Sequence, residues 1–184
     1  MRLKAENALA GDDTRQKPAL TAILTQIARL DRLIAELLAM TQRRTSTPVP
    51  TPLKLFLQTC IADYRTITIE TPDTTVTVDP DLLRRALDSL LQNAAHHTPP
   101  AGTITLRATT TPTTLHLEIA DTGPGVSENL KKTLFDPFVT GRSDGTGLGL
   151  AIARELIQAM HGIITLAPTT PGATFLIDLP CPPS

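Results

Sequence analysis

The chain of 184 residues is poor in aromatic residues and cysteine, and it carries little net charge. Phenylalanine, tyrosine and tryptophan make up 3% of the residues, and the formal net charge is −1. A nucleic-acid surface needs clustered basic residues and aromatic rings for base stacking, so we expect no nucleic-acid partner. The two cysteines, Cys60 and Cys181, have the spacing of neither a metal site nor a redox pair, and we expect ordinary packing roles for both.

Long apolar runs are also missing. No stretch contains the roughly 20 consecutive apolar residues that a membrane-spanning helix needs. Residues 1–4 at the N-terminus lack the apolar core of a signal peptide. We therefore expect this portion of the protein to be cytoplasmic and to make no direct membrane contact.

Apolar residues recur at steps of three and four between residues 17 and 44, which is the spacing of a coiled-coil seam. The seam consists of Leu20, Ile23, Ile27, Leu30, Ile34 and Leu37, and Leu24, Leu33 and Leu38 widen it. A stripe this broad suits a four-helix arrangement, because a single helix cannot bury it. We expect a partner helix here; the alternative is a helix that folds back on its own chain.

Composition divides the chain into a helical segment at residues 1–45, a linker at 46–51 rich in serine, threonine and proline, and a domain at 52–181. Thr51 and Pro52 predict the start of a helix that continues to about Tyr64. Alternating residues predict strands at 67–69 and 76–78, on either side of a turn at 71–73.

A long amphipathic helix is predicted after Asp79, which is a favourable N-cap, with Pro80 in the first helical position. Near the end of this helix, Asn93 lies one helical turn after Ser89. The two side chains can therefore face the same side.

Alternation also predicts strands at 103–109, 115–120, 163–166 and 173–179. The second of these strands runs into residues 121–125, Asp-Thr-Gly-Pro-Gly. A carboxylate at the mouth of a pocket can accept a hydrogen bond from an exocyclic amine such as N6 of adenine. Asp121 is a candidate for this role; the alternative is an aspartate that merely begins a turn.

Gly145, Gly147 and Gly149 alternate and lead directly into an amphipathic run, residues 150–157, which is typical of a helix. Glycines let the backbone approach a ligand, and the amides at a helix N-terminus suit a phosphate. The P-loop and the dinucleotide fingerprint are excluded, because neither Gly-Lys-Ser/Thr nor a βαβ setting is present. Alone this pattern also fits a flexible turn, but together with Asp121 it predicts a nucleotide site.

Four motifs resemble, in order, the N, G1, F and G2 boxes of the sensor histidine kinases. They are Asn93-Ala94, residues 121–125, residues 135–138 (Phe-Asp-Pro-Phe) and residues 145–150 (Gly-Thr-Gly-Leu-Gly-Leu). These kinases belong to an ATPase superfamily with gyrase, Hsp90 and MutL. The resemblance covers residues 48–180 and implies an α+β fold of the Bergerat type. This fold is a two-layer α/β sandwich in which three helices cover one face of a mixed, mainly antiparallel sheet, preceded here by a helical dimerisation segment.

The resemblance implies that ATP and Mg²⁺ bind among these motifs. It assigns Asn93 to Mg²⁺, which prefers oxygen ligands, and Arg142 to the γ-phosphate when the lid closes. His96 falls where the family often has a basic residue, and a solvated helix-end histidine is an equal alternative. The expected cofactor-binding residues are Asn93, His96, Asp121, Gly123, Gly125, Phe138, Gly145, Thr146, Gly147, Leu148 and Gly149. Asn93 and Arg142 are the expected catalytic residues.

The implied activity is that of an ATP-dependent protein-histidine kinase in two-component signal transduction. The γ-phosphate would pass to a histidine on the first helix of the dimerisation hairpin, then to an aspartate of a response-regulator receiver domain. No histidine precedes His96, so we expect the acceptor segment to be missing, by truncation or by nature, and the chain alone not to autophosphorylate. Ser89 stands where hydrolysing relatives carry a glutamate base, which predicts slow hydrolysis.

Further expectations and two alternatives follow from the same resemblance. The helical segment predicts a homodimer, and a sensor region elsewhere in the full-length protein could anchor it to a membrane. An anti-sigma-type serine kinase shares the boxes, but the coiled-coil-like helix argues against it. A non-catalytic nucleotide sensor that signals by lid closure is disfavoured by the intact Asn93, Asp121 and G2 glycines.

Overall fold

A computed structural model of the chain describes residues 21, 23–27, 30, 45–64, 67–141, 145–168 and 171–181. The chain divides into two compact units, residues 1–42 and 43–184. In the first unit the described residues are helical, and the hydroxyl of Thr25 donates to the carbonyl of Thr21 at 2.9 Å. Ile23 and Leu30 of the expected seam are 51% and 56% exposed. Most of the predicted stripe, including Leu20, lies outside the described residues.

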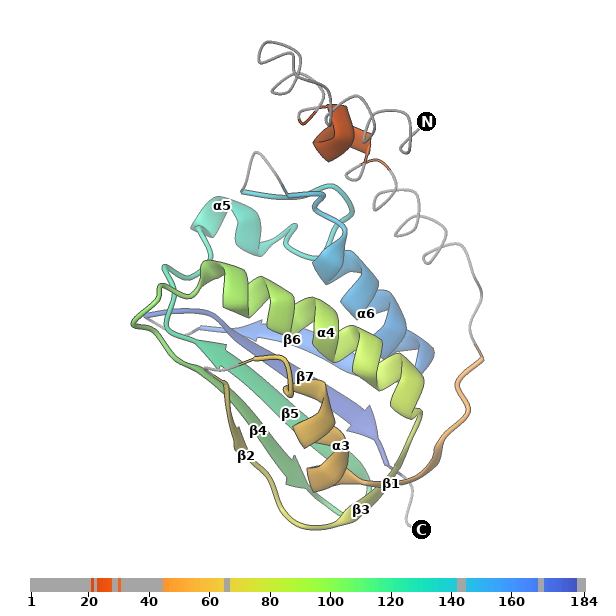
Figure 1. Ribbon diagram of the computed structural model, residues 1–184. Coiled ribbons are helices and arrows are strands. Elements are labelled where there is room, and N and C mark those ends of the chain that lie inside the picture. The colour runs from red at the N-terminus through yellow and green to blue at the C-terminus, as the bar shows by residue number, and fades with distance from the viewer. Residues whose placement is uncertain are drawn as a thin grey trace, which may run out of the picture. The chain divides into compact units, whose positions relative to one another are not determined.

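The second unit is built on a five-stranded sheet with the strand order β2-β4-β5-β7-β6 (Figure 1). Its strands are β2 (Ile67–Glu70), β4 (Ile104–Thr110), β5 (Thr114–Asp121), β6 (Ile163–Ala167) and β7 (Thr174–Pro180). Strand β2 pairs with β4 in parallel, and the other neighbours are antiparallel. This arrangement confirms the predicted mixed, mainly antiparallel sheet.

Strict alternation along the central strand explains why one face of the sheet forms the core. In β5, Leu115, Leu117 and Ile119 are buried, and the residues between them are partly exposed. The register places Ile119 opposite Leu106 of β4 and Phe175 of β7, both also buried. The apolar side chains of the three strands therefore meet on one face.

Three helices cover this face: α3 (Leu53–Cys60), α4 (Pro80–His97) and α6 (Gly149–Ala159) (Figure 1). As predicted, Asp79 caps α4: its Oδ1 accepts from the amides of Asp81 and Leu82, at 3.1 and 3.0 Å. A short helix, α5 (Glu128–Lys131), lies in the segment between β5 and α6. These three helices on one sheet face confirm the two-layer architecture that the family resemblance implied.

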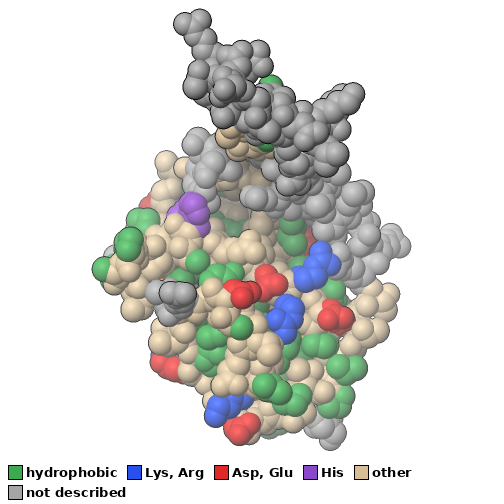
Figure 2. Space-filling view, viewed as in Figure 1, with side chains coloured by type: hydrophobic (Ala, Val, Ile, Leu, Met, Phe, Trp, Pro, Cys, Tyr) green, Lys and Arg blue, Asp and Glu red, His purple; other side chains and the backbone are tan. Residues whose placement is uncertain are grey.

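Acidic and basic side chains are interspersed among apolar ones on the face that α3 and α4 present (Figure 2). Arg84 of α4 illustrates the mixture: it donates to the hydroxyl of Thr59 at 2.6 Å and lies 5.4 Å from the ring centre of Phe56. Within the described ranges, no helix is both long and apolar enough to cross a bilayer.

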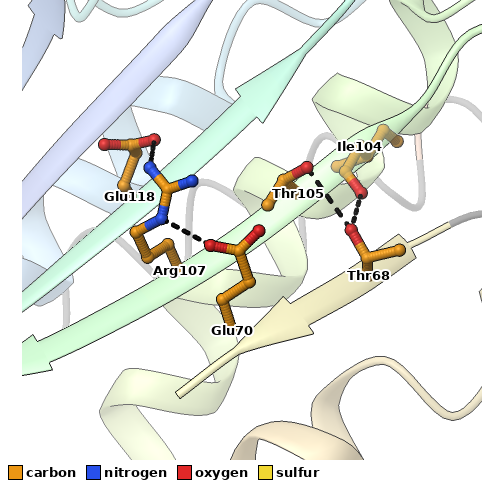
Figure 3. Close-up of polar contacts among 6 residues, drawn as sticks. All are labelled: Thr68, Glu70, Ile104, Thr105, Arg107 and Glu118. Atoms are coloured by element: carbon orange, nitrogen blue, oxygen red, sulfur yellow. Dashed lines mark hydrogen bonds and ion pairs between the residues drawn. The ribbon is translucent and has the colours of Figure 1, made fainter. Parts of the chain in front are cut away.

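The opposite face of the sheet is mostly polar. Arg107 of β4 lies between Glu70 of β2 and Glu118 of β5, with contacts of 2.7 and 2.9 Å (Figure 3). The same view shows the hydroxyl of Thr68 directed at the carbonyl of Ile104 and the hydroxyl of Thr105, both at 3.4 Å. Exposed ion pairs of this kind add little stability, so the apolar face holds the sheet to the helices.

A second, two-stranded sheet differs from the sequence expectations. Strand β1 (Val49–Pro52) pairs antiparallel with β3 (Thr75–Val78), and the backbone N–H of Thr47 donates to Oδ2 of Asp79 at 2.8 Å. The predicted linker at 46–51 is therefore largely attached to the compact unit, which begins at residue 43. Composition marked these residues as a linker because it cannot show pairing with a distant strand.

The strands predicted on either side of the turn at 71–73 are present, and they join different sheets: β2 pairs with β4 and β3 with β1. The helix start expected at Thr51 was wrong. Thr51 does not cap α3: its hydroxyl donates to the carbonyl of Val49 at 3.0 Å, and α3 begins without a side-chain cap.

Candidate nucleotide-binding site

Asp121 ends β5 with its side chain buried at 6% exposure. Its Oδ1 accepts from the backbone N–H groups of Gly123, at 2.8 Å, and Ala173, at 3.4 Å. Among the described residues, none donates a hydrogen bond to Oδ2. A buried carboxylate oxygen is unfavourable without a donor, so this oxygen is suited to a ligand that brings one.

The turn before β7 completes this end of the site, and the sequence did not predict its role. The N–H of Asp121 donates to the carbonyl of Ala173 at 2.9 Å. Gly172 has a φ of 92°, and a Cβ added to it would lie 1.8 Å from the carbonyl oxygen of Asp121. Only glycine permits both this conformation and this approach. The dipeptide Pro171-Gly172 signals a turn, but nothing in the local sequence says which strand the turn meets.

Gly123 and Gly125 bring the segment after Asp121 against two other parts of the unit. A Cβ added to Gly125 would lie 2.8 Å from the carbonyl oxygen of Gly172, and one added to Gly123 would lie 2.7 Å from that of His97. His97 is the last residue of α4. The Asp121 turn therefore packs against the C-terminal end of this helix.

Two predicted site residues lie in the last turns of α4. Asn93 is half-buried, and His96 is exposed, with its ring edge-to-face against that of His97 at 5.5 Å between centroids. Both residues therefore belong to the helix end that adjoins Gly123.

The second glycine stretch is joined to the Phe-Asp-Pro-Phe motif through the backbone. The N–H of Phe138 donates to the carbonyl of Gly147 at 3.0 Å. Gly147 has a φ of 70°, and an added Cβ would lie 2.5 Å from the carbonyl carbon of Phe138. Phe138 itself has a φ of 66° and is 62% exposed, whereas Phe135 packs against Phe175 at 6.2 Å between ring centroids. A non-glycine residue at positive φ is strained, and such strain is often found at functional sites.

Helix α6 begins at Gly149, directly after this contact. Leu148 is fully buried; its N–H donates to the hydroxyl of Thr146 at 3.3 Å, and its carbonyl accepts from Ile152 at 2.8 Å. Helix geometry leaves the amides of residues 149–151 without an intrahelical acceptor. Because the helix dipole makes this end positive, these amides form the part of the site suited to an anion.

Ser89 connects α4 to this helix start. Its hydroxyl donates to the carbonyl oxygen of Gly149 at 2.7 Å. Asn93 follows one turn later on the same face of α4, toward the end that adjoins the Asp121 turn. The hydrogen bond of Ser89 thus links the start of α6 to the helix that carries Asn93.

Contacts group the predicted site residues around α4. The turn with Asp121, Gly123 and Gly125 packs against the end of this helix, and Ser89 of the same helix bonds to Gly149, which follows Phe138, Thr146, Gly147 and Leu148 in the other group. Asn93 and His96 lie on α4 between and beside these contacts. Gly145 is half-buried at the start of the second glycine stretch. Arg142 lies outside the described residues.

Two carboxyl groups of α4 and its cap have shifted pKa values. Burial alone would raise the pKa of Asp79, but hydrogen bonds from the amides of Leu82, Thr47 and Asp81 and from the hydroxyl of Thr47 outweigh it, and the pKa is lowered. Burial raises the pKa of Asp88, although the nearby guanidinium of Arg84 opposes the shift. Neither group belongs to the glycine motifs.

Comparisons with known proteins find similar chains in one ATPase family. The family described as histidine kinase-, DNA gyrase B-, and HSP90-like ATPase matches residues 78–183, more than half of the chain. The probable sensor histidine kinase TcrY of Mycobacterium tuberculosis is 29% identical over 189 residues, covering 92% of this chain and 40% of that protein. The sensory histidine kinase/phosphatase NtrB of Klebsiella oxytoca is 41% identical over 114 residues, covering 55% of this chain and 32% of that protein.

The chain spans less than half of the length of these two relatives. Among solved structures, full-length ShkA in complex with AMPPNP is similar, with a TM-score of 0.76 and 25% sequence identity. That similarity covers 98% of this chain and 42% of ShkA. The region matched by the family contains every motif from Asn93 to Gly149 and also Gly172.

Proposed function

The chain belongs to the histidine kinase-, DNA gyrase B- and HSP90-like ATPases, and we propose that it is the ATP-binding catalytic portion of a sensor histidine kinase. The buried carboxylate of Asp121 carries this proposal, because one oxygen is held by two amides and the other has no donor among the described residues. The N6 amine of adenine is a donor of the required kind. The N-terminus of α6 suits the phosphates of the same nucleotide.

The residues present also fit Mg²⁺. Asn93 has a side-chain carbonyl oxygen, which is a ligand that Mg²⁺ accepts alongside water and phosphate oxygens. When bound, the ion neutralises charge that develops on the transferred phosphoryl group. Asn93 would hold the ion, and Arg142 would contact the γ-phosphate. His96, at the exposed end of α4, would donate a ring N–H to a phosphate oxygen.

Phosphoryl transfer depends chiefly on placement and charge neutralisation, and these are what this unit offers. Ser89 is not a strong base, and its hydroxyl already donates to Gly149, so rapid attack by water is not expected. We place the acceptor histidine on a helix outside the catalytic unit, and the next acceptor on the receiver domain of a response regulator.

The proposed assembly is a homodimer. Ile23 and Leu30 expose apolar surface that suits the helix of a second copy of the chain. We place this portion of the protein in the cytoplasm, where response regulators act.

The full-length protein incubated with Mg-ATP labelled in the γ-phosphate tests this function. The expected product is a phosphoprotein whose label is lost in acid and retained in alkali, as phosphohistidine chemistry requires. An acid-stable phosphoserine would instead support the anti-sigma-type serine kinase. Nucleotide binding without any transfer would support the non-catalytic sensor.

A further inference from the structure

The hydrogen bond between Ser89 and Gly149 joins two helices at the anion-binding end of the site. Ser89 is half-buried in α4, and its hydroxyl lies 2.7 Å from the carbonyl oxygen of Gly149, the first residue of α6. A mid-helix serine commonly donates to the carbonyl four residues earlier in its own helix. Here the hydroxyl donates to the neighbouring helix instead.

We propose that Ser89 is a positioning residue, which sets the spacing between Asn93 and the phosphate-binding amides of α6. The inference rests on the proposed function, because it assigns a role within the nucleotide site. In this proposal Ser89 acts through the carbonyl of Gly149, to which its hydroxyl is bonded, and not by direct contact with the nucleotide.

The local packing leaves little freedom at this contact. A Cβ added to Gly149 would lie 3.1 Å from the Ser89 hydroxyl oxygen, which is tighter than an ordinary carbon contact. Leu148, just before, is fully buried. If the start of α6 shifted relative to α4, the amides of residues 149–151 would move as one group. Their distance from Asn93 on α4 would therefore change.

The adenine end of the site is held by a different set of contacts. Asp121 is fixed by the amides of Gly123 and Ala173, and neither residue contacts Ser89 or Gly149 through a hydrogen bond. Loss of the Ser89 hydroxyl should therefore weaken binding of the phosphates and leave binding of the base unchanged. A hydrogen bond that only stabilises the fold would affect both ends alike.

The test compares Ser89→Ala with Ser89→Thr, which keeps a hydroxyl, and with Gln92→Ala, an exposed position on α4. Calorimetry gives the Kd of Mg-ATP, and an NMR titration gives the Kd of adenosine. For Ser89→Ala we expect Mg-ATP to bind about fivefold more weakly, the effect of one net hydrogen bond, with adenosine unchanged within about twofold. Ser89→Thr should restore most of the affinity, and Gln92→Ala should match the wild type.

Gly149→Ala disturbs the same contact from the α6 side. It should likewise lower the affinity for Mg-ATP and leave the affinity for adenosine unchanged. Urea unfolding of each variant verifies that the protein being titrated is folded. Equal weakening of Mg-ATP and adenosine, or no change in either, would overturn the positioning role. If the wild type itself failed to bind Mg-ATP, the proposed function would fail, which is a separate outcome from the behaviour of the variants.

Discussion

Substitution of Gly172 by alanine should destabilise the protein and disturb the part of the site around Asp121. The added Cβ would lie 1.8 Å from the carbonyl oxygen of Asp121, although real Cβ atoms essentially never come within 3.0 Å of such an atom. The φ of 92° is also unfavourable for alanine. Because the obstructing atom belongs to the backbone of β5, no side-chain rotation can relieve the contact.

The positive φ of Gly172 and the overlap of the added Cβ with the Asp121 carbonyl oxygen together set the expected loss of stability. Positive φ costs an alanine about 1–2 kcal/mol, and displacement of packed backbone brings the expected loss in unfolding free energy to about 2–4 kcal/mol. Relief of the contact requires the Asp121 turn to move by roughly 1 Å, which is enough to take a hydrogen bond at its carboxylate out of the normal range of lengths. Binding of Mg-ATP should therefore suffer as well as stability.

Urea denaturation and nucleotide titration of Gly172→Ala check this prediction, with Gly141→Ala as a matched control. A Cβ at Gly141 would lie 3.5 Å from Cδ1 of Leu130, which is ordinary contact, and its φ is not positive. The control should stay within about 1 kcal/mol of the wild type. If the two variants had the same stability and affinity, the packing of Gly172 on Asp121 could not be as described.

Other parts of the same unit give further predictions. Asp79→Ala should lower the unfolding free energy by about 1–2 kcal/mol at neutral pH, through loss of the α4 cap. Because the pKa of Asp79 is lowered in the fold, its stabilisation is present above the ordinary carboxyl pKa and is lost as the pH falls through the lowered value, so urea unfolding in acid should show a smaller difference. The raised pKa of Asp88 means that its ionised form is disfavoured in the fold, so Asp88→Asn should be more stable at neutral pH by less than about 1 kcal/mol, and a loss of stability would contradict this. Burial raises the pKa of the Cys60 thiol to about 11, so a thiol reagent should label Cys60 only in denaturant; rapid labelling of the folded protein would show that the thiol is accessible.

Features encoded within a few residues were predictable from the sequence. The N-cap at Asp79, the alternation of Leu115, Leu117 and Ile119, and the helix that begins at Gly149 each depend on local chemistry, and the structure contains them all. The glycine pattern and Asp121 together predicted a nucleotide site. The resemblance of four ordered motifs supplied the fold, which the structure and the family match then confirmed.

Features that depend on which segments meet in space were not predictable. Val49 lies in a stretch with linker composition and becomes part of a strand only because it pairs with Val78. Gly172 looks like any turn glycine until β7 is placed beside β5. The partner of the Ser89 hydroxyl is likewise fixed by the packing of α4 against α6, which no periodicity specifies.

The central claim is that Asp121 and the amides at the start of α6 bind opposite ends of one adenine nucleotide. Calorimetric titration of Mg-ATP into the wild type and into Asp121→Asn tests it directly, because asparagine places an amide donor where the carboxylate accepts. We predict one saturable site in the wild type and an affinity about 10- to 100-fold lower in the variant, the effect of losing a hydrogen bond to a charged group. No binding heat from the folded wild type, or equal affinities in the two proteins, would contradict the account.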